Sequence, residues 1–194
     1  CVSRGLTRAF LVADLPFMSY ATPTAALHNA ARLMQAGGAS MVKLEGGAEQ
    51  LAIVTALAGQ GIPVCAHLGL QPQSIHKLGG YRVQGRTTDE AARLRQDAAA
   101  LVAAGADLMI LECVPAALAG QIAEQLPIPV IGIGAGPGTD GQILVVHDLL
   151  GLTPGGGPRF ARDFIAGTPS IEAAMHAYVQ AVKQGHFPSM AESF

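Results

Sequence analysis

The sequence predicts an α/β fold built from repeated strand–helix units, and three observations support it. Short apolar runs alternate with helix-period segments, the order typical of a parallel sheet covered by helices. A glycine-marked unit recurs, since residues 36–45 resemble residues 103–112. Polar residues also follow several apolar runs, at the strand ends where barrel enzymes place their active sites. A (β/α)8 TIM barrel is therefore the first choice, and a doubly wound open sheet is the second.

Length and composition favour one soluble domain over residues 1–194. Half of the 194 residues are hydrophobic, which is enough to build a buried core. The net charge is −2 and there is no basic tract, so we expect no nucleic-acid partner. No apolar run approaches the length of a membrane span, and no signal peptide is recognisable. Cys1, Cys65 and Cys113 lack metal-site spacing, which favours reduced thiols and a cytoplasmic location.

The apolar runs give the expected strands. They lie at residues 9–14, 40–45, 62–67, 107–112, 128–133 and, more weakly, 159–164. They mostly do not alternate with polar residues, as in strands covered on both faces. A closed barrel needs eight strands, so we expect this chain to lack the first two βα units and to be an N-terminally incomplete barrel domain. Residues 1–5 fit the tail of a helix.

Helices are expected between these strands, and three positions mark their ends. Thr24 is expected to cap the first long helix after Pro23. Pro115 suits the first turn of a later helix, and Ser170 is expected to cap the last one.

Ionisable residues follow four of the expected strands. Asp14 ends the first, Lys43 and Glu45 end the second, His67 ends the third and Glu112 ends the fourth. In a barrel these side chains would meet at one rim. Strand ends are also where solvent begins, so a solvated rim is the plainer interpretation.

Lys43 and Glu45 are two residues apart and therefore share one face of their strand. A buried unpaired charge is costly, so we expect them to pair with each other or to bind something. A structural ion pair is the plainer interpretation. In the functional one, Lys43 holds an anionic substrate, and Asp14 and Glu45 supply the hard oxygen ligands that suit Mg²⁺.

Glu112 lies at an apolar strand end and is the candidate general base. Desolvation there would favour the protonated carboxyl, whereas the dipole of a helix starting near Pro115 would favour the carboxylate. The sequence leaves that competition open. It also leaves His67 open as a ligand, a base or a hydrogen-bonded core residue.

Two loops complete the expected site. Residues 132–141 are rich in glycine, and their match to a dinucleotide-binding pattern is weak because Pro137 interrupts it. We interpret these glycines as clearance for backbone near a bound ligand. The long loop over residues 69–88 is a candidate lid.

Several motifs together resemble the ketopantoate hydroxymethyltransferase family. They are Ala13-Asp-Leu-Pro-Phe-Met18, Met41-Val-Lys-Leu-Glu-Gly-Gly47, His67-Leu-Gly-Leu-Gln-Pro-Gln-Ser74, Gly79-Gly-Tyr-Arg-Val-Gln-Gly85, Leu111-Glu-Cys-Val-Pro115 and Ile131-Gly-Ile-Gly-Ala-Gly136. The likeness runs in order through all 194 residues. No single motif is specific, but the combination is.

The resemblance implies a (β/α)8 barrel of the phosphoenolpyruvate/pyruvate type. It implies transfer of a hydroxymethyl group from 5,10-methylenetetrahydrofolate to 3-methyl-2-oxobutanoate, which gives 2-dehydropantoate for pantothenate and coenzyme A synthesis. It also implies Mg²⁺, a cytoplasmic location and a homo-oligomer, commonly a decamer. By motif, Asp14 would bind metal and substrate, Lys43 would bind the keto acid, Glu45 would be a metal ligand and Glu112 would be the proton acceptor.

The sequence departs from the family in one respect, and two other functions stay open. Family members begin with further residues that hold a Val-Gly-Asp-Ser metal and substrate motif, and this chain contains none. A catalytically inactive truncated homologue is therefore one alternative. A lysine Schiff-base aldolase with Lys43 as nucleophile is the other, although Glu45 beside it would keep the lysine protonated.

Overall fold

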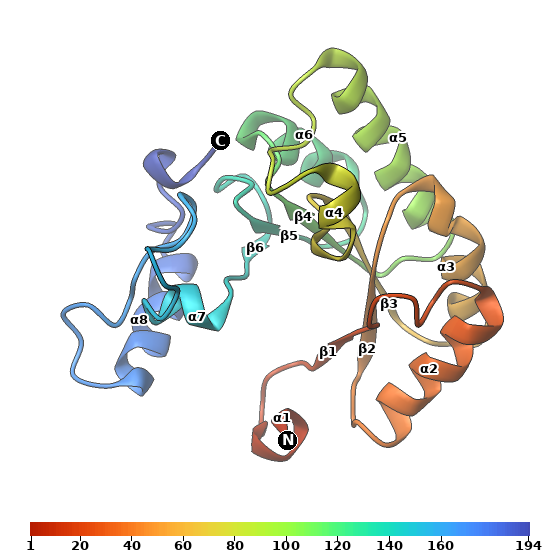
Figure 1. Ribbon diagram of the computed structural model, residues 1–194, viewed down its shortest axis with the longest axis horizontal. Helices are drawn as coiled ribbons and strands as arrows, with labels where there is room; N and C mark the ends of the chain where they lie inside the picture. Colours follow the sequence, from red (N-terminus) through yellow and green to blue (C-terminus); the bar gives the residue numbers. More distant parts are fainter.

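The computed structural model describes residues 1–194 and contains one sheet of six parallel strands. The strands are β1 (Val12–Asp14), β2 (Met41–Glu45), β3 (Val64–Gly69), β4 (Leu108–Glu112), β5 (Val130–Ile133) and β6 (Gly141–Gln142). They lie side by side in chain order, and the sheet curls like part of a barrel wall (Figure 1). β1 and β6 pair on one side only, so the sheet is an open half-barrel.

Helices follow the strands in the expected alternation. They are α1 (Val2–Gly5), α2 (Pro23–Gln35), α3 (Leu51–Ala58), α4 (Ile75–Leu78), α5 (Thr88–Ala103), α6 (Ala116–Gln125), α7 (Val146–Leu149) and α8 (Ile171–Lys183), with 3-10 turns η1 (Ala48–Gln50), η2 (Pro72–Ser74) and η3 (Met190–Glu192). Figure 1 shows α2, α3, α5 and α6 along the outer side of the sheet, and α7 and α8 beyond β6. None of these helices combines the length and the hydropathy of a membrane-spanning segment.

Alternation along the strands divides the core into two parts. On the convex face, Val42, Leu44, Ala66, Met109 and Leu111 pack against the helices in a cluster of 23 buried residues. On the concave face, a cluster of seven lies between the sheet and the C-terminal segments. Its members are Met41, Cys65, Leu70, Ile110, Cys113, Ile133 and Phe160. Each fully buried aliphatic side chain stabilises the fold by about 2 kcal/mol, so both faces hold the strands in place.

The expectation of a sixth strand at residues 159–164 is wrong. That segment contains no strand, only turn, bend and irregular residues, and the sixth strand is Gly141–Gln142. Phe160 and Phe164 are buried for another reason, since Phe160 fills the concave cluster and Phe164 packs in a separate cluster with α8. The apolar pattern at residues 159–164 therefore comes from loop residues whose side chains are buried in the core, not from a strand. The other five expected strands are confirmed, with boundaries that shift by up to three residues.

Helix ends agree with the sequence in part. Ser170 caps α8 as expected, because its hydroxyl accepts a hydrogen bond from the Ala173 amide. Thr22, not Thr24, caps α2, and Pro23 occupies the first turn. Pro at the first helical position needs no amide partner, so the cap falls one residue before it. Pro115 is itself the residue before α6.

The glycines of the β5–β6 loop serve internal packing. A Cβ on Gly134 would lie 2.7 Å from the Phe160 ring, and one on Gly136 would collide with Ala116. Both residues also have left-handed backbone angles, with φ of 61° and 75°. The expectation that these glycines clear space for a ligand is therefore wrong at these two positions, where the chain itself fills the space.

Gly134→Ala should destabilise the fold more than Gly155→Ala. Both residues have a positive φ, which costs a non-glycine residue about 1 kcal/mol. Only Gly134 faces another side chain, because a Cβ on Gly155 would meet nothing within 4 Å. We expect urea unfolding to show an additional loss of about 1–3 kcal/mol for Gly134→Ala. Equal losses would show that Phe160 moves aside without cost.

Candidate active site

Parallel strand register brings the five polar strand-end residues to one rim of the sheet. Asp14 pairs in register with Lys43, Glu45 with His67, and Gly69 with Glu112. Asp14, Lys43, Glu45, His67 and Glu112 all line one cavity of about 430 Å³. Its remaining wall includes apolar side chains from β4, β5 and the segment after β6. The five residues therefore meet at one rim, as expected, and their roles there stay a prediction.

The Lys43 ammonium lies at the centre of this group. Its Nζ is 2.8 Å from Asp14 Oδ1, 3.3 Å from His67 Nδ1 and 3.6 Å from Glu45 Oε1. The Lys43 side chain is 16% exposed and that of Glu45 is 4% exposed, whereas Asp14 is 48% exposed. The expected pairing of Lys43 with Glu45 is therefore present, and Asp14 shares the same cation.

Glu45 is held by a network that sequence analysis missed. The backbone amide of Gln73 donates to Glu45 Oε2 at 2.9 Å, and the Tyr20 hydroxyl donates to the side-chain Oε1 of Gln73 at 2.6 Å. The Gln73 side chain also donates to the Leu15 carbonyl, so it joins the loops after β1 and β3. Burial raises the pKa of Tyr20 to about 12, which keeps the hydroxyl a donor. Gln73 lies in a motif quoted above, but a lone glutamine gives no local signal of this role.

Glu112 ends β4 with its backbone fixed on both sides. Its carbonyl accepts from the Leu70 amide at 2.8 Å, and the next amide, of Cys113, donates to the Ile133 carbonyl at 2.9 Å. Cys113 has a left-handed φ of 49°. This conformation is strained for any residue other than glycine, and such residues are often found at functional sites. The Glu112 side chain is 13% exposed, and its Oε2 is 3.2 Å from His67 Nε2.

The oxygen donors present fit a magnesium ion with few protein ligands. Asp14 and Glu45 both lie within 4 Å of the same cationic nitrogen, so their carboxylates already converge on a positive charge. No group of three or more His, Cys, Asp or Glu side chains is arranged to hold a metal. Mg²⁺ is commonly held by one or two carboxylates with water and substrate oxygens completing its shell, so the pair is sufficient in type and number.

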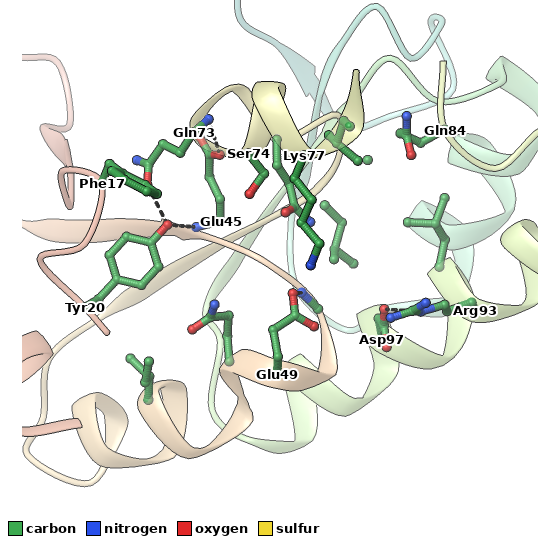
Figure 2. A pocket seen from close by; sticks show the side chains of 18 of the residues that line it. Phe17, Tyr20, Glu45, Glu49, Gln73, Ser74, Lys77, Gln84, Arg93 and Asp97 are labelled. Carbon is green, nitrogen blue, oxygen red and sulfur yellow. Dashed lines mark hydrogen bonds and ion pairs between the residues drawn. The ribbon is translucent and has the colours of Figure 1, made fainter. Parts of the chain in front are cut away.

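A second, larger cavity of about 660 Å³ adjoins the first across Glu45 and Gln73. Figure 2 shows Lys77, Glu49, Arg93 and Asp97 around it, with Tyr20 beside Glu45. Burial raises the pKa of Asp97 above its usual range. The loop over residues 69–88, with η2 and α4, forms one wall.

Comparison with known proteins assigns the chain to a family. The family model described as ketopantoate hydroxymethyltransferase matches residues 1–190. The chain belongs to this family. Proteins named 3-methyl-2-oxobutanoate hydroxymethyltransferase from Alkalilimnicola ehrlichii and Halorhodospira halophila are each 61% identical over 194 residues, which is all of this chain and 70% of theirs. A protein of the same name from Shewanella loihica is 58% identical over 194 residues, which is all of this chain and 73% of that protein.

A solved structure of another protein shares the fold. A putative phosphonomutase from Burkholderia cenocepacia superposes with a TM-score of 0.51 at 18% identity, over 92% of this chain and 69% of that one. The half-barrel sheet is therefore an arrangement that other α/β proteins share.

The two buried thiols of this family member should be unreactive. Burial raises the pKa of Cys65 to about 12, and burial with the adjacent Glu112 charge raises the pKa of Cys113 to about 12. Because the thiolate is the nucleophile, both stay protonated near neutral pH, whereas Cys1 is exposed. Dithionitrobenzoate at pH 8 should titrate one thiol rapidly in the folded chain and three after unfolding. Three rapid thiols would show that the concave cluster holding Cys65 and Cys113 opens readily.

Proposed function

We propose that this protein transfers a hydroxymethyl group to 3-methyl-2-oxobutanoate, as the names of its relatives describe for them. The observation that carries this proposal is the charge of the 430 Å³ cavity. Three carboxylates, from Asp14, Glu45 and Glu112, face one ammonium, that of Lys43. Because the cavity already carries excess negative charge, an anionic keto acid can bind there only together with a further cation. A divalent metal bound to the keto acid would be that cation.

The proposed roles follow from exposure and position. Asp14 is the most exposed of the carboxylates and lies at the rim, so it can face both metal and keto acid. Glu45 is buried and fixed by Gln73, which suits a metal ligand that must not move. Lys43 lies between them and can balance the substrate carboxylate when a metal takes its place beside Asp14 and Glu45. Mg²⁺ bound there would stabilise negative charge on the substrate's keto oxygen.

Glu112 is the proposed proton acceptor. It lies in the same cavity, beside Ile110 and Ile133, whose apolar side chains can contact the isopropyl end of the keto acid. Water would add to the methylene carbon of 5,10-methylenetetrahydrofolate and break its bonds to N5 and N10, which releases tetrahydrofolate and formaldehyde. The Glu112 carboxylate would take the proton from the carbon next to the ketone, and the resulting enolate carbon would bond to the formaldehyde carbon, whose oxygen takes up a proton to become the new hydroxyl. Holding both substrates in position contributes much of the rate.

A Schiff-base aldolase is less compatible with this geometry. Two carboxylate oxygens and a ring nitrogen surround the Lys43 nitrogen at 2.8–3.6 Å. Asp14 Oδ1 and His67 Nδ1 lie within hydrogen-bond distance of the ammonium, and Glu45 Oε1 pairs with its charge, whereas a nucleophilic amine needs a free lone pair.

The open sheet supports a larger barrel. We propose that β1 and β6, each unpaired on one side, are joined by further strands in a complete (β/α)8 barrel, since free sheet edges invite aggregation. Family likeness supports a cytoplasmic homo-oligomer, commonly a decamer, whose mass light scattering would measure.

Glu112→Gln should abolish exchange of the substrate's C3 proton. The amide keeps the shape but cannot accept the proton, so we expect a loss of at least about 100-fold. Proton NMR of 3-methyl-2-oxobutanoate in D₂O measures this rate, and calorimetry checks that binding persists. Glu124→Gln, on the exposed surface of α6, is the matched control. Exchange at the native rate would assign the base to another group.

Removal of divalent metal should stop turnover. A chelator should abolish C3 proton exchange and added Mg²⁺ should restore it, because the cavity alone carries excess negative charge. Glu45→Gln should raise the Mg²⁺ concentration needed for half-maximal exchange by about tenfold or more. Full activity in chelator, with borohydride trapping of substrate on Lys43, would support the aldolase instead.

A further inference from the structure

His67 connects two parts of the proposed site. Its side chain is only 4% exposed, and the ring lies between the Lys43 ammonium and the Glu112 carboxylate. The contact from Nδ1 to Lys43 Nζ is 3.3 Å, and the contact from Nε2 to Glu112 Oε2 is 3.2 Å. No step proposed above uses this ring, although burying a polar ring without a role is costly.

The surroundings of Lys43 determine which ring nitrogen carries the proton. An ammonium has three N–H donors and no acceptor. Asp14, Glu45 and His67 Nδ1 are the three groups around it. His67 Nδ1 must therefore accept, and in a neutral imidazole the proton then lies on Nε2.

The opposite tautomer lacks a partner. A proton on Nδ1 would point at the Lys43 ammonium, and the nearest carboxylate oxygen, Glu45 Oε1, is 3.8 Å away, beyond hydrogen-bond distance. A doubly protonated ring would place a second cation 3.3 Å from Lys43, which is repulsive at short range.

We propose that His67 is a positioning residue for Glu112, with its Nε2–H holding one carboxylate oxygen so that the other faces the substrate. The proposal rests on the function assigned to Glu112 above. Nε2 is buried and forms no well-aligned hydrogen bond in this structure, and Glu112 Oε2 is within ion-pair distance of it. Catalytic hydrogen bonds are often poorly aligned without substrate and tighten when it binds.

This arrangement also decides among the roles that the sequence left open for His67. Its Nδ1 lone pair faces the ammonium and its Nε2 carries the proton, so the ring has no free lone pair with which to act as a base or a metal ligand. It instead couples the group that would bind the substrate's charge to the group that would take its proton.

The tautomer can be measured without any turnover. In protein labelled with ¹⁵N-histidine, His67 should show a pyrrole-type Nε2 and a pyridine-type Nδ1. Its resonances, among those of six histidines, are assigned as the set that disappears in His67→Gln. A pyrrole-type Nδ1 or a doubly protonated ring would overturn the proposal.

Two substitutions separate the two nitrogens. In His67→Gln the side-chain amide can replace the Nε2 donor, whereas in His67→Asn the amide oxygen can replace the Nδ1 acceptor. We expect His67→Gln to raise KM for the keto acid and keep kcat for C3 proton exchange within about tenfold. We expect His67→Asn to keep KM and lower kcat by about 100-fold, the scale of a misplaced catalytic group.

The outcomes distinguish this inference from the proposed function. If both variants lose kcat equally while both unfold at the wild-type temperature, the donor at Nε2 does not position Glu112, and the inference is wrong. If Glu112→Gln keeps native exchange, the proposed function fails whatever the histidine variants do. If either histidine variant unfolds early, the tautomer in the unaltered protein still decides, with its resonances assigned at a temperature at which His67→Gln is folded.

Discussion

The site depends on one buried cation. The Lys43 ammonium is surrounded by two carboxylates and a ring nitrogen, and without it Glu45, which is 4% exposed, would be an uncompensated charge in a low-dielectric cavity. The strand register places these groups together, because Asp14, Lys43 and Glu45 lie on the concave face of neighbouring parallel strands. The helices on the convex face keep that register fixed.

Function and stability use different faces of the same strands. Alternate residues of each strand, such as Leu44 and Leu111, pack into the helical layer. The residues between them face the inside of the half-barrel, with apolar side chains deep in it and charged ones at its rim. This division lets the rim hold costly charges and a left-handed residue, Cys113, while the large core of buried aliphatic side chains supplies the stability that offsets them.

The loops after the strands make the rim specific. The Gln73 side chain hydrogen-bonds Leu15 and Tyr20 and so connects the loop after β3 to the segment after β1, and its backbone amide holds Glu45. Membership of the ketopantoate hydroxymethyltransferase family agrees with such a rigid site, since a keto acid must be held in one orientation while its proton is removed. His67 adds a link from Lys43 to Glu112 across the same rim.

The sequence by itself determined five of the six strands, the four polar strand ends and the family, because these depend on local periodicity and on motifs that stand in order. It did not find β6, which has two residues and no apolar run, and it mistook the anchoring of Phe160 for a strand. Only the tertiary structure decided that Asp14 and Glu45 share Lys43, that Gln73 supports Glu45, and that His67 faces Glu112. These contacts join residues distant in the chain, so strand register and loop packing alone fix them.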